Sequence, residues 1–501
     1  MTEESQPETE PSESDASEFP SEEPEMSAPE VPDEPSAQVE APDGPASPAP
    51  RWKRAIPPLV IFLVTASVYV LVAGPRTDAP SPNNHYVHLA ESWLNGQLDV
   101  VGGEPHGYND WACFDETLEG PCDANAFQRP RDSYRWYISF PPFPAAVLLP
   151  VVAVFGQDFS DPFFWALFAG LAPALLWLVL RRLREEKISP RSPREDLLLV
   201  TVFAFGSVYF STAVQGSVWF SAHIVASALL MLFFLFGIGA KRPFWAGVAL
   251  GLCFWTRPST SLFALFFLLE AMRVNRRPNA RAADPEAGVW RRLGRWILGA
   301  DPVATIKACL PFAAPILVVG GVAMWMNHAR FADPFEFGHT YLIIRWRPRI
   351  EKWGLFNFHY FSKNLAVFVA SLPWLSAATP WVKISRHGLA LWFTSPNLLP
   401  ALWPKRVTPM MVSLFVVTAM IAVWDLCYQN SGWVQFGYRF SLDYMPALIV
   451  LLALSRRRFG VGFGLLLAFA IAVNLFGAIT FDRAAMFYDD DNSQERLFQP
   501  D

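Results

Sequence analysis

Long apolar stretches alternate with short basic segments between residues 51 and 480. The first stretch, Ala55–Ala73, is about long enough to cross a hydrocarbon core of ~30 Å. Ten more lie near residues 162–180, 197–214, 217–239, 244–256, 259–271, 303–326, 388–403, 409–427, 444–454 and 459–480. Several of them contain Pro or Gly, which a membrane helix tolerates where neighbouring helices bury it. The pattern predicts an all-α polytopic membrane protein with about 11 transmembrane helices.

The basic residues predict the orientation of these helices. They form six clusters, at 51–54, 181–194, 241–242, 273–295, 405–406 and 456–458. Because Lys and Arg gather on the cytoplasmic side of a membrane, an even number of crossings must separate the first two clusters. The Pro-rich stretch 141–156 lies between them and would rise only ~24 Å as a helix, so we expect an interfacial or re-entrant juxtamembrane helix on the outer face. The N-terminus is then cytoplasmic and the C-terminus periplasmic or extracellular, as expected for a protein of a bacterial inner membrane.

The net charge of −6 averages two unlike parts of the 501-residue chain. Residues 1–50 hold 15 acidic residues and no Lys or Arg, which leaves 31 acidic and 40 basic residues in 51–501. An acidic, Pro-rich segment with so little to bury is expected to be a disordered cytoplasmic tail. We expect the transmembrane domain over 51–485 and a polar C-terminal tail at 486–501. Since the basic excess marks helix ends, it does not indicate a nucleic-acid partner; the expected surroundings are a lipid bilayer.

Three outer loops are substantial, at 74–140, 327–385 and 428–443. Their size favours an active site on the outer face. In the first outer loop, 74–140, the apolar positions of Asn83–Gly96 suit an interfacial helix lying on the membrane surface. This loop ends in the aromatic and Pro-rich sequence Tyr134–Pro144.

The order of these parts resembles the GT-C class of membrane glycosyltransferases, in particular bacterial mannosyltransferases and arabinosyltransferases. The resemblance rests on one helix followed by a large outer loop, which contains a helix with the class pattern Tyr, Ala, Leu, Gly and closes on a Pro-Pro-led juxtamembrane helix. Ala246–Pro258 is similar to the fifth and sixth helices of that class, and Gln435–Pro446 to its late Gly-x-Arg-Tyr segment. The resemblance implies transfer of a hexose or pentose from a polyprenyl-phosphate-linked donor to a glycan, lipid or protein acceptor.

One position departs from the pattern of the class. The resemblance places a catalytic Asp three residues before Tyr86, where this chain has Asn83, and an amide cannot accept a proton as a carboxylate does. Among the remaining acids of the first outer loop we favour Asp110 as the general base, with Glu91 as the second candidate. The alternatives are a turn-capping loop acid for Asp110 and the wet face of an interfacial helix for Glu91.

Two arginines are candidates for holding the donor phosphate. Arg257 and Arg439 are expected at the outer membrane edge, where a guanidinium can bind a phosphate through two parallel hydrogen bonds. The alternative for Arg257 is snorkelling to the lipid headgroups. The alternative for Arg439 is a salt bridge with Asp443, one helical turn away.

Three further residues of the outer loops are candidates for substrate binding. They are His85, Tyr86 and His339, and for His339 a turn packed on the membrane surface is the alternative. His85, His88 and Glu91 are spaced by three residues and leave a metal site open as an alternative, but no clear metal-ligand set is predicted. A divalent cation is therefore possible without being assigned, and no other cofactor is expected.

Cys113 and Cys122 are the cysteines of the outer loops, and such a pair on the oxidising side is expected to form a disulfide. No P-loop, Rossmann Gly-rich turn, zincin motif or Gly-x-Ser-x-Gly elbow occurs. This fits an enzyme whose activated donor is a lipid.

Two other functions stay open. A transporter or lipid flippase would carry ionisable residues within its helices; Asp425 is one, but the helices are otherwise nearly free of charge and show no inverted repeat. A non-catalytic member of the class that binds a lipid-linked sugar would be compatible with Asn83.

Overall fold

The computed structural model describes residues 51–103, 110–123, 125–277, 289–344 and 346–489. The predicted N-terminal tail, 1–50, lies outside these residues, and so does the larger part of the predicted C-terminal tail. Within the described part, six helical segments are long and apolar enough to cross a membrane, at 53–78, 161–185, 218–240, 302–331, 409–426 and 461–480. By length and composition they agree with the prediction of a multi-pass membrane protein.

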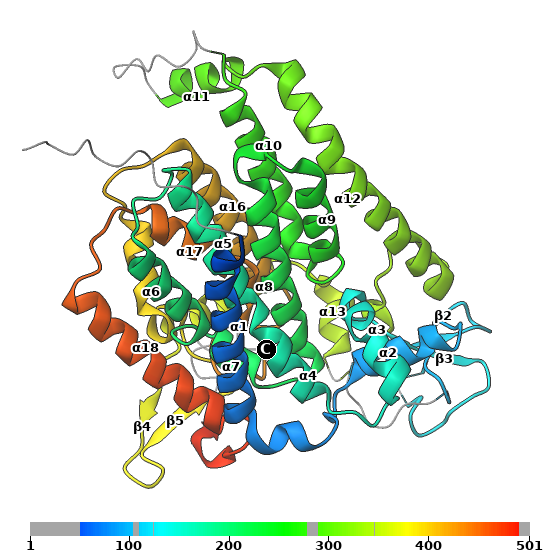
Figure 1. Cartoon of the computed structure of the whole chain (residues 1–501). Coiled ribbons are helices and arrows are strands. Elements are labelled where there is room, and N and C mark those ends of the chain that lie inside the picture. The colour runs from blue at the N-terminus through cyan, green and yellow to red at the C-terminus, as the bar shows by residue number, and fades with distance from the viewer. Residues whose placement is uncertain (1–50, 104–109, 124, 278–288, 345, 490–501) are drawn as a thin grey trace, which may run out of the picture. The chain divides into compact units, whose positions relative to one another are not determined.

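The long segments are made of one helix or of two consecutive ones. They are α1 (Arg51–Ala73) with η1 (Gly74–Asp78), α4 (Asp161–Ala169) with α5 (Leu171–Glu185), α8 (Val218–Gly237) with η2 (Ile238–Ala240), α12 (Pro302–Phe331), α16 (Pro409–Leu426) and α18 (Val461–Thr480). Shorter helices stand between them: α6 (Pro193–Ala204), α7 (Tyr209–Ala213), α9 (Pro243–Phe254), η3 (Pro258–Leu262) with α10 (Phe263–Val274), and η8 (Arg439–Asp443) with α17 (Met445–Leu454). The connecting segments carry α2 (His85–Leu94), α3 (Phe143–Phe155), α11 (Val289–Leu298), η5 (His339–Tyr341), α13 (Arg347–Trp353), η6 (Phe358–Tyr360), α14 (Phe361–Ala370) and η9 (Ala485–Phe487). Figure 1 shows α8 deep among the helices, and both α5 and α9 pack against it.

The local sequence explains where several helices begin. A Pro stands in the first turn of α4, α6, α12 and α16, where its missing N–H costs no hydrogen bond. Before α6, the Ser192 hydroxyl accepts a bond from the Glu195 backbone and the Glu195 carboxylate accepts one from the Ser192 backbone at 2.9 Å, which is a capping box. Asp301 caps α12 by accepting a bond from the backbone of Ala304 at 3.0 Å.

Basic clusters that are far apart in the sequence meet at one end of the helices, called the basic end below. Arg181 donates a hydrogen bond to the backbone oxygen of Arg54 at 2.8 Å. Lys241 pairs with Glu186 at 2.6 Å. These contacts join the first three clusters, as the predicted topology requires.

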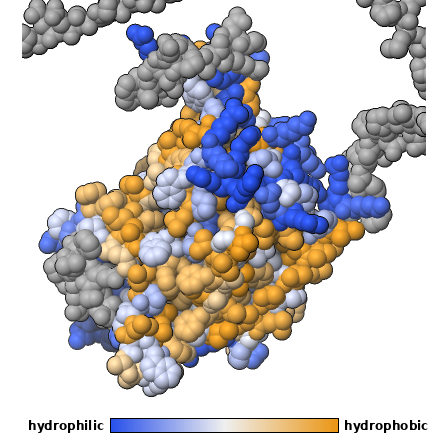
Figure 2. All heavy atoms as spheres, turned by 90° about the vertical axis from the view of Figure 1, so that its left-hand side faces the viewer, coloured by the Kyte–Doolittle hydropathy of each residue, from blue (hydrophilic) through white to orange (hydrophobic). Residues whose placement is uncertain are grey.

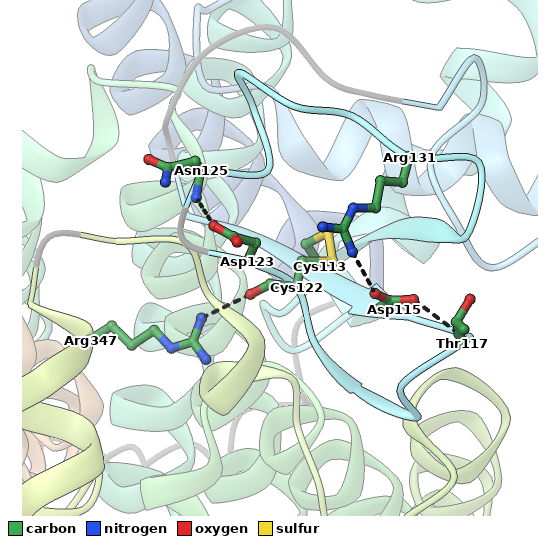
Figure 3. Close-up of a disulfide and its surroundings, with 8 residues drawn as sticks. All are labelled: Cys113, Asp115, Thr117, Cys122, Asp123, Asn125, Arg131 and Arg347. Carbon is green, nitrogen blue, oxygen red and sulfur yellow. Dashed lines mark hydrogen bonds and ion pairs between the residues drawn. A yellow bond between two sulfur atoms is a disulfide. The ribbon is translucent and has the colours of Figure 1, made fainter.

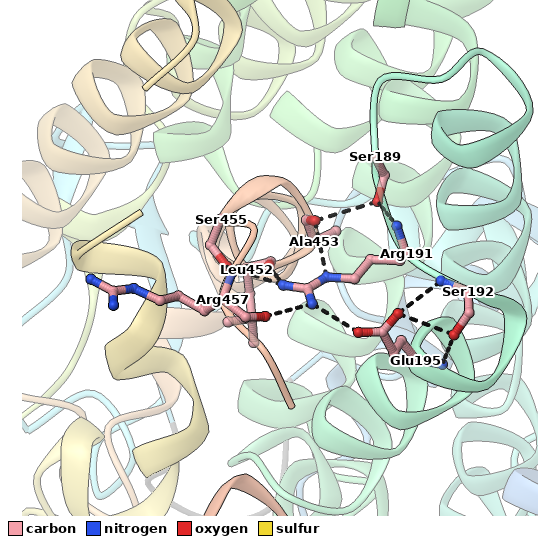
Figure 4. A network of polar contacts seen from close by, with 8 residues as sticks. All are labelled: Ser189, Arg191, Ser192, Glu195, Leu452, Ala453, Ser455 and Arg457. Atoms are coloured by element: carbon pink, nitrogen blue, oxygen red, sulfur yellow. Dashed lines mark hydrogen bonds and ion pairs between the residues drawn. The ribbon is translucent and has the colours of Figure 1, made fainter. Parts of the chain in front are cut away.

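Arg191 connects the basic end to the segment that follows α17 (Figure 4). Its guanidinium pairs with Glu195 at 3.0 Å and donates to the backbone oxygen of Arg457 at 2.6 Å. The backbone N–H of Lys405 donates to the oxygen of Ser455 at 2.9 Å. The clusters at 405–406 and 456–458 therefore share the basic end, and its assignment to the cytoplasm stays a prediction.

Apolar side chains cover the outward faces of the long helices. On the side drawn in Figure 2, hydrophobic residues form a broad surface, and hydrophilic ones gather toward one end. Val461 and Leu465 of α18 are 82% and 67% exposed, and Leu317 and Trp325 of α12 are 73% and 62% exposed. Surfaces of this kind are a liability in water but are the normal boundary toward lipid.

The predicted crossing at 388–403 is not a continuous helix. It consists of α15 (Leu391–Thr394) and the 3-10 helix η7 (Pro396–Leu402), and the Pro that begins η7 has no N–H to continue the helical bonds. The buried Asn474 of α18 compensates, because its side-chain amide donates to the backbone oxygen of Thr394 at 2.7 Å. An unsatisfied backbone group costs several kcal/mol in hydrocarbon, so this amide stabilises the break.

We expect Asn474→Ala to lower the free energy of unfolding by about 1–3 kcal/mol, because the Thr394 carbonyl loses its donor in apolar surroundings. Thermal unfolding of the purified protein in detergent micelles measures the effect. Leu466→Ala removes an exposed apolar side chain from the same helix and should lower the midpoint much less. Equal shifts in the two variants would mean that the amide does not stabilise the break.

Two small sheets correct the expectation of an all-α fold. The first has the strand order β2-β1-β3 and the second β4-β5-β6, built from β1 (Trp111–Asp115), β2 (Gly120–Pro121), β3 (Tyr134–Ile138), β4 (Trp374–Leu375), β5 (Val382–Ser385) and β6 (Tyr488–Asp489). β1 and β3 are antiparallel and place Cys113 opposite Trp136. Segments this short and this rich in aromatic and β-branched residues favour strands over helices once they can pair.

A disulfide joins Cys113 of β1 to Cys122, the residue after β2 (Figure 3). The backbone of Cys122 also donates to the oxygen of Cys113 at 3.2 Å, and its own oxygen accepts a bond from Arg347 at 3.5 Å. Asp110 directly precedes β1, so the bridged sheet holds the backbone on one side of Asp110 in place.

The first described residues of the predicted polar tail at 486–501 belong to η9 and to strand β6 of the second sheet. Tyr488 of β6 is only 7% exposed, and its hydroxyl lies 2.7 Å from that of Thr480. Pairing of β6 with β5 buries this aromatic ring, so residues 486–489 belong to the packed structure and not to a tail.

Candidate active site

The helix α8 connects the outer loops to the basic end. Its first residue, Val218, donates its backbone N–H to the oxygen of Asn83 in the first outer loop at 3.1 Å. At its other end, the oxygen of Ile238 accepts a bond from Arg182 at 2.6 Å. The first two turns of α8 therefore lie on the side of the outer loops, and they carry Trp219, Phe220 and His223.

Asp443, the last residue of η8, is fully buried beside these turns. Arg257, just before η3, donates to its carboxylate from Nε at 3.0 Å and from Nη2 at 2.7 Å. Ser259 Oγ donates at 2.5 Å, and His223 Nδ1 lies 3.1 Å from Oδ1. Burial alone would raise the pKa of Asp443, but Arg257 and His223 outweigh it and hold that pKa well below its usual range. Asp443 is thus a carboxylate that fixes the position of Arg257.

Two guanidinium groups lie against the ring of Phe440. The Cζ atoms of Arg257 and Arg439 are each 5.3 Å from its centroid. Arg439 also lies 5.2 Å from the ring of Phe220 and donates to the backbone oxygen of Val434 at 3.0 Å. Burial and the charge of Arg257 lower the pKa of Arg439 to about 9. Two cations this close favour the binding of an anion, because its charge would offset their repulsion.

The salt bridge between Arg439 and Asp443 that the sequence left as an alternative does not form. These residues belong to a 3-10 helix, in which positions four apart point about 120° away from each other. Asp443 instead pairs with Arg257, whose side chain is 23% exposed. Because Asp443 holds only the Nε and Nη2 edge, the other edge of the Arg257 guanidinium still carries donors for a ligand.

Asp110 lies at the same site. Its Oδ2 accepts a hydrogen bond from the indole Nε1 of Trp219 at 2.9 Å. Its backbone has φ of 59°, an unusual conformation for a residue other than Gly. Burial raises the pKa of the Asp110 carboxyl, while the bond from Trp219 and the charge of Arg439 act against this rise. A half-buried carboxylate with a raised pKa that interacts electrostatically with a guanidinium has the properties of a general base.

His85 and Tyr86, at the start of α2, are buried. The His85 ring stacks on that of Trp111 with centroids 4.2 Å apart, and it lies 6.2 Å from the ring of Trp219. Burial raises the pKa of the Tyr86 phenol, and the charge of Arg257 acts on it in the opposite direction. His85 thus packs against Trp111, which follows Asp110, and lies near Trp219, which bonds to Asp110, while Tyr86 interacts electrostatically with Arg257.

Glu91 and His339 lie apart from this group. Among the described residues, no hydrogen bond or ion pair recorded for the Glu91 carboxylate links it to Asp110, Asp443 or the two arginines. His339 neighbours Arg330 of α12 instead, and burial together with the charge of Arg330 lowers its pKa to about 4.

Asn83, which occupies the position of the expected Asp, lines a small cavity with Tyr86 and Asp161. The Asp161 carboxylate accepts bonds from the backbone and the hydroxyl of Ser81, at 2.6 and 2.7 Å. The Asp161 carboxylate thus fixes the start of the first outer loop. Its oxygens are occupied by Ser81, so Asp161 does not replace the Asp that the class pattern has at position 83. In the described ranges, no three His, Cys, Asp or Glu side chains are grouped so that they could hold a metal ion.

Several residues of the site do not stand out as functional in the sequence. They are Trp219, His223, Ser259 and Asp443. His223 carries the clearest overlooked signal, since an ionisable residue in an otherwise apolar membrane helix points to function. Asp425, which the sequence does flag, is 4% exposed and interacts electrostatically with Arg257.

The fold of this protein is distantly similar to one solved structure. No protein-family model matches the sequence, and no curated protein matches it either. A crystal structure of ArnT from Cupriavidus metallidurans bound to undecaprenyl phosphate is similar over 87% of this chain and 68% of that chain, at 14% identity and a TM-score of 0.42. A likeness of this degree assigns neither a family nor an activity, so the function has to be inferred from the side chains of the site.

Proposed function

We propose that this protein is a membrane glycosyltransferase that moves a sugar from a polyprenyl-phosphate donor to an acceptor on the outer face of the membrane. The observation that carries the proposal is the grouping of Asp110, Arg439 and Arg257, which come from three distant parts of the chain, around a few aromatic side chains. Trp219 bonds to Asp110, Arg439 lies 5.2 Å from the ring of the next residue, Phe220, and both arginines lie 5.3 Å from the ring of Phe440. A carboxylate able to accept a proton thus belongs to the same site as two guanidinium groups able to bind a phosphate. The sequence resemblance to the GT-C class supports the same reaction.

Asp110 acts as the general base of an inverting transfer. Its carboxylate removes the proton from a hydroxyl of the glycan, lipid or protein acceptor as the acceptor oxygen bonds to the anomeric carbon of the sugar. The bond between that carbon and the phosphate oxygen breaks at the same time. The products are the glycosylated acceptor and the polyprenyl phosphate, and the proton ends on Asp110.

The two arginines stabilise the leaving phosphate. Negative charge grows on its oxygens as the glycosidic bond breaks, because a singly charged phosphodiester becomes a doubly charged phosphate monoester. Guanidinium donors placed there in advance bind this larger charge more strongly than the single charge of the ground state. Asp443 orients Arg257 for this role, and the ring of Phe440 lies against both cations. No step assigned here depends on a metal ion, and the sugar and acceptor are left open.

The experiment that tests the proposal uses purified protein in bilayer nanodiscs with a panel of labelled polyprenyl-phosphate sugars. Release of labelled polyprenyl phosphate that requires an acceptor is the expected result. Movement of the intact donor across vesicle membranes without release would support a flippase and overturn the proposal. Binding of the donor without release under any acceptor condition would identify a non-catalytic binding protein.

The pH dependence of the transfer tests the role of Trp219. Because only the ionised Asp110 accepts a proton, kcat/KM should rise with pH through the pKa of Asp110. Trp219→Phe removes a donor that favours the carboxylate, so the acidic limb should move to higher pH by about one unit. Trp392→Phe, which removes an indole bond to the backbone oxygen of Val369 at 2.8 Å, is the matched control and should leave the limb in place. If the acidic limb is unchanged in Trp219→Phe, the group that titrates in the pH profile is not Asp110.

A further inference from the structure

The helix α11, Val289–Leu298, lies outside the proposed active site and has an unusual composition. Six of its ten residues are apolar, three are Arg and one is Gly. It therefore combines strong positive charge with a large apolar content in less than three turns.

Backbone hydrogen bonds fix the position of α11 at the basic end. The N–H of Arg277, after α10, donates to the oxygen of Gly299 at 3.0 Å, and the N–H of Asp301 donates to the oxygen of Asn275 at 2.9 Å. The adjoining last turns of α10 reach the same end, because Glu270 accepts a bond from the backbone of Gly239 at 2.8 Å. In Figure 1, α11 runs across the ends of α10 and α12 and not parallel to them.

The described side chains of α11 divide into two groups. Arg291 and Arg295 are four residues apart, so they share one side of the helix, and both are exposed. Ile297 is 48% exposed, and at 100° per residue it points to the opposite side. Leu298, at the end of the helix, is 79% exposed, and the same rotation places it on the side of Arg291 and Arg295.

The apolar exposure of α11 continues into the first turns of α12. Val303, Ile306 and Leu310 are 60%, 57% and 64% exposed, and they belong to a helix that is long and apolar enough to cross the membrane. Exposed basic residues accompany this surface, since Lys307 stands among these apolar positions and the exposed Arg277 bonds through its backbone to Gly299, the residue after α11. The exposed apolar surface at the start of α12 is thus continuous with α11, and the other side of α11 carries the exposed arginines.

We propose that α11 is an interfacial helix that binds the anionic phospholipid headgroups of the leaflet at the basic end. A helix with apolar residues on one side and Arg on the other lies in the plane of the membrane interface, with the apolar side toward the acyl chains. Anionic headgroups attract basic residues near the surface. Two observations favour a lipid partner with a negative charge. The apolar surface of α11 is continuous with that of α12, and Arg291 and Arg295 supply positive charge.

The first test compares lipid binding by the full-length protein and two charge-reversal variants. Detergent-solubilised protein is incubated with equal amounts of phosphatidylglycerol and phosphatidylcholine, and the bound lipids are counted by native mass spectrometry. We expect phosphatidylglycerol to be enriched on the wild-type protein, and R291E/R295E to lower this enrichment at least about fivefold. R456E/R458E makes the same change of charge on exposed residues elsewhere at the basic end and is expected to retain most of the enrichment. Equal enrichment in all three proteins, or equal loss in both variants, would overturn the proposal.

The second test measures the depth of α11 in a bilayer. An environment-sensitive fluorophore is attached at I297C, on the side opposite Arg291 and Arg295, after Ala replaces the three free cysteines, Cys253, Cys309 and Cys427. In nanodiscs that contain about 30 mol% phosphatidylglycerol, we expect blue-shifted emission that quenchers on the lipid chains reduce. Emission typical of water in these nanodiscs would overturn the proposal and would indicate that this side of α11 is available to a protein partner.

Discussion

Asp110→Asn is expected to lower kcat for sugar transfer by about 10²–10⁴-fold, the usual contribution of a general base. The amide keeps the size of the side chain, and its oxygen can still accept the bond from Trp219, but it cannot take the acceptor proton. Donor binding should change little, because the phosphate is assigned to Arg257 and Arg439. Release of labelled polyprenyl phosphate gives kcat, and equilibrium binding of the same donor gives its Kd.

The control for this substitution is Asp123→Asn. Asp123 is an exposed acid of the same outer loop, whose carboxylate accepts a bond from the backbone of Asn125 at 2.8 Å. The control variant should retain nearly full activity. Unchanged turnover in Asp110→Asn would remove this residue from the mechanism, and Glu91→Asn would then be the next substitution to assay.

The pairing of Arg257 with Asp443 gives the second large effect. Asp443→Leu leaves the guanidinium of Arg257 without its carboxylate in a buried site, and the loss of one partner from such a pair costs about 3–5 kcal/mol. Arg257→Met should cost a similar amount, because it leaves the Asp443 carboxylate with only Ser259 and His223. The double variant, Arg257→Met/Asp443→Leu, should be more stable than the sum of the single effects by at least about 1 kcal/mol.

Equilibrium unfolding of the four proteins in mixed micelles measures this coupling. Arg257→Met combined with Asp196→Leu is the control pair, since Asp196 is buried against Arg184 near the basic end and should act independently of Arg257. The stable double variant should still fail to release polyprenyl phosphate, because a ligand for the phosphate is gone. Strict additivity would show that the pair does not act as a unit. Normal turnover in the double variant would exclude Arg257 from phosphate binding.

The sequence predicted that the basic clusters lie at one end of the helices, and the contacts between these clusters agree with it. This prediction needs only local properties of the sequence. Hydrophobic length and the position of Lys and Arg act on each segment separately, so they can be evaluated without knowledge of the tertiary structure. The same evaluation failed for 388–403, because average hydropathy does not register the helix break at Pro396 or the distant amide of Asn474. It also failed for the strands of the outer loops, whose formation depends on a partner strand.

By itself, then, the amino-acid sequence determined that this is a multi-pass protein with its basic segments on one side, and it singled out Asp110, Arg257 and Arg439. It could not determine how they are arranged. Trp219 and Asp110 are 109 residues apart, and Arg257 and Asp443 are 186 apart. The spacing left a salt bridge between Asp443 and the nearer Arg439 as an alternative, but the tighter winding of η8 turns those two residues away from each other. Only the packing of α8, η3 and η8 decided which charges meet, because contacts between distant segments depend on how whole helices fit together and leave no trace in local spacing.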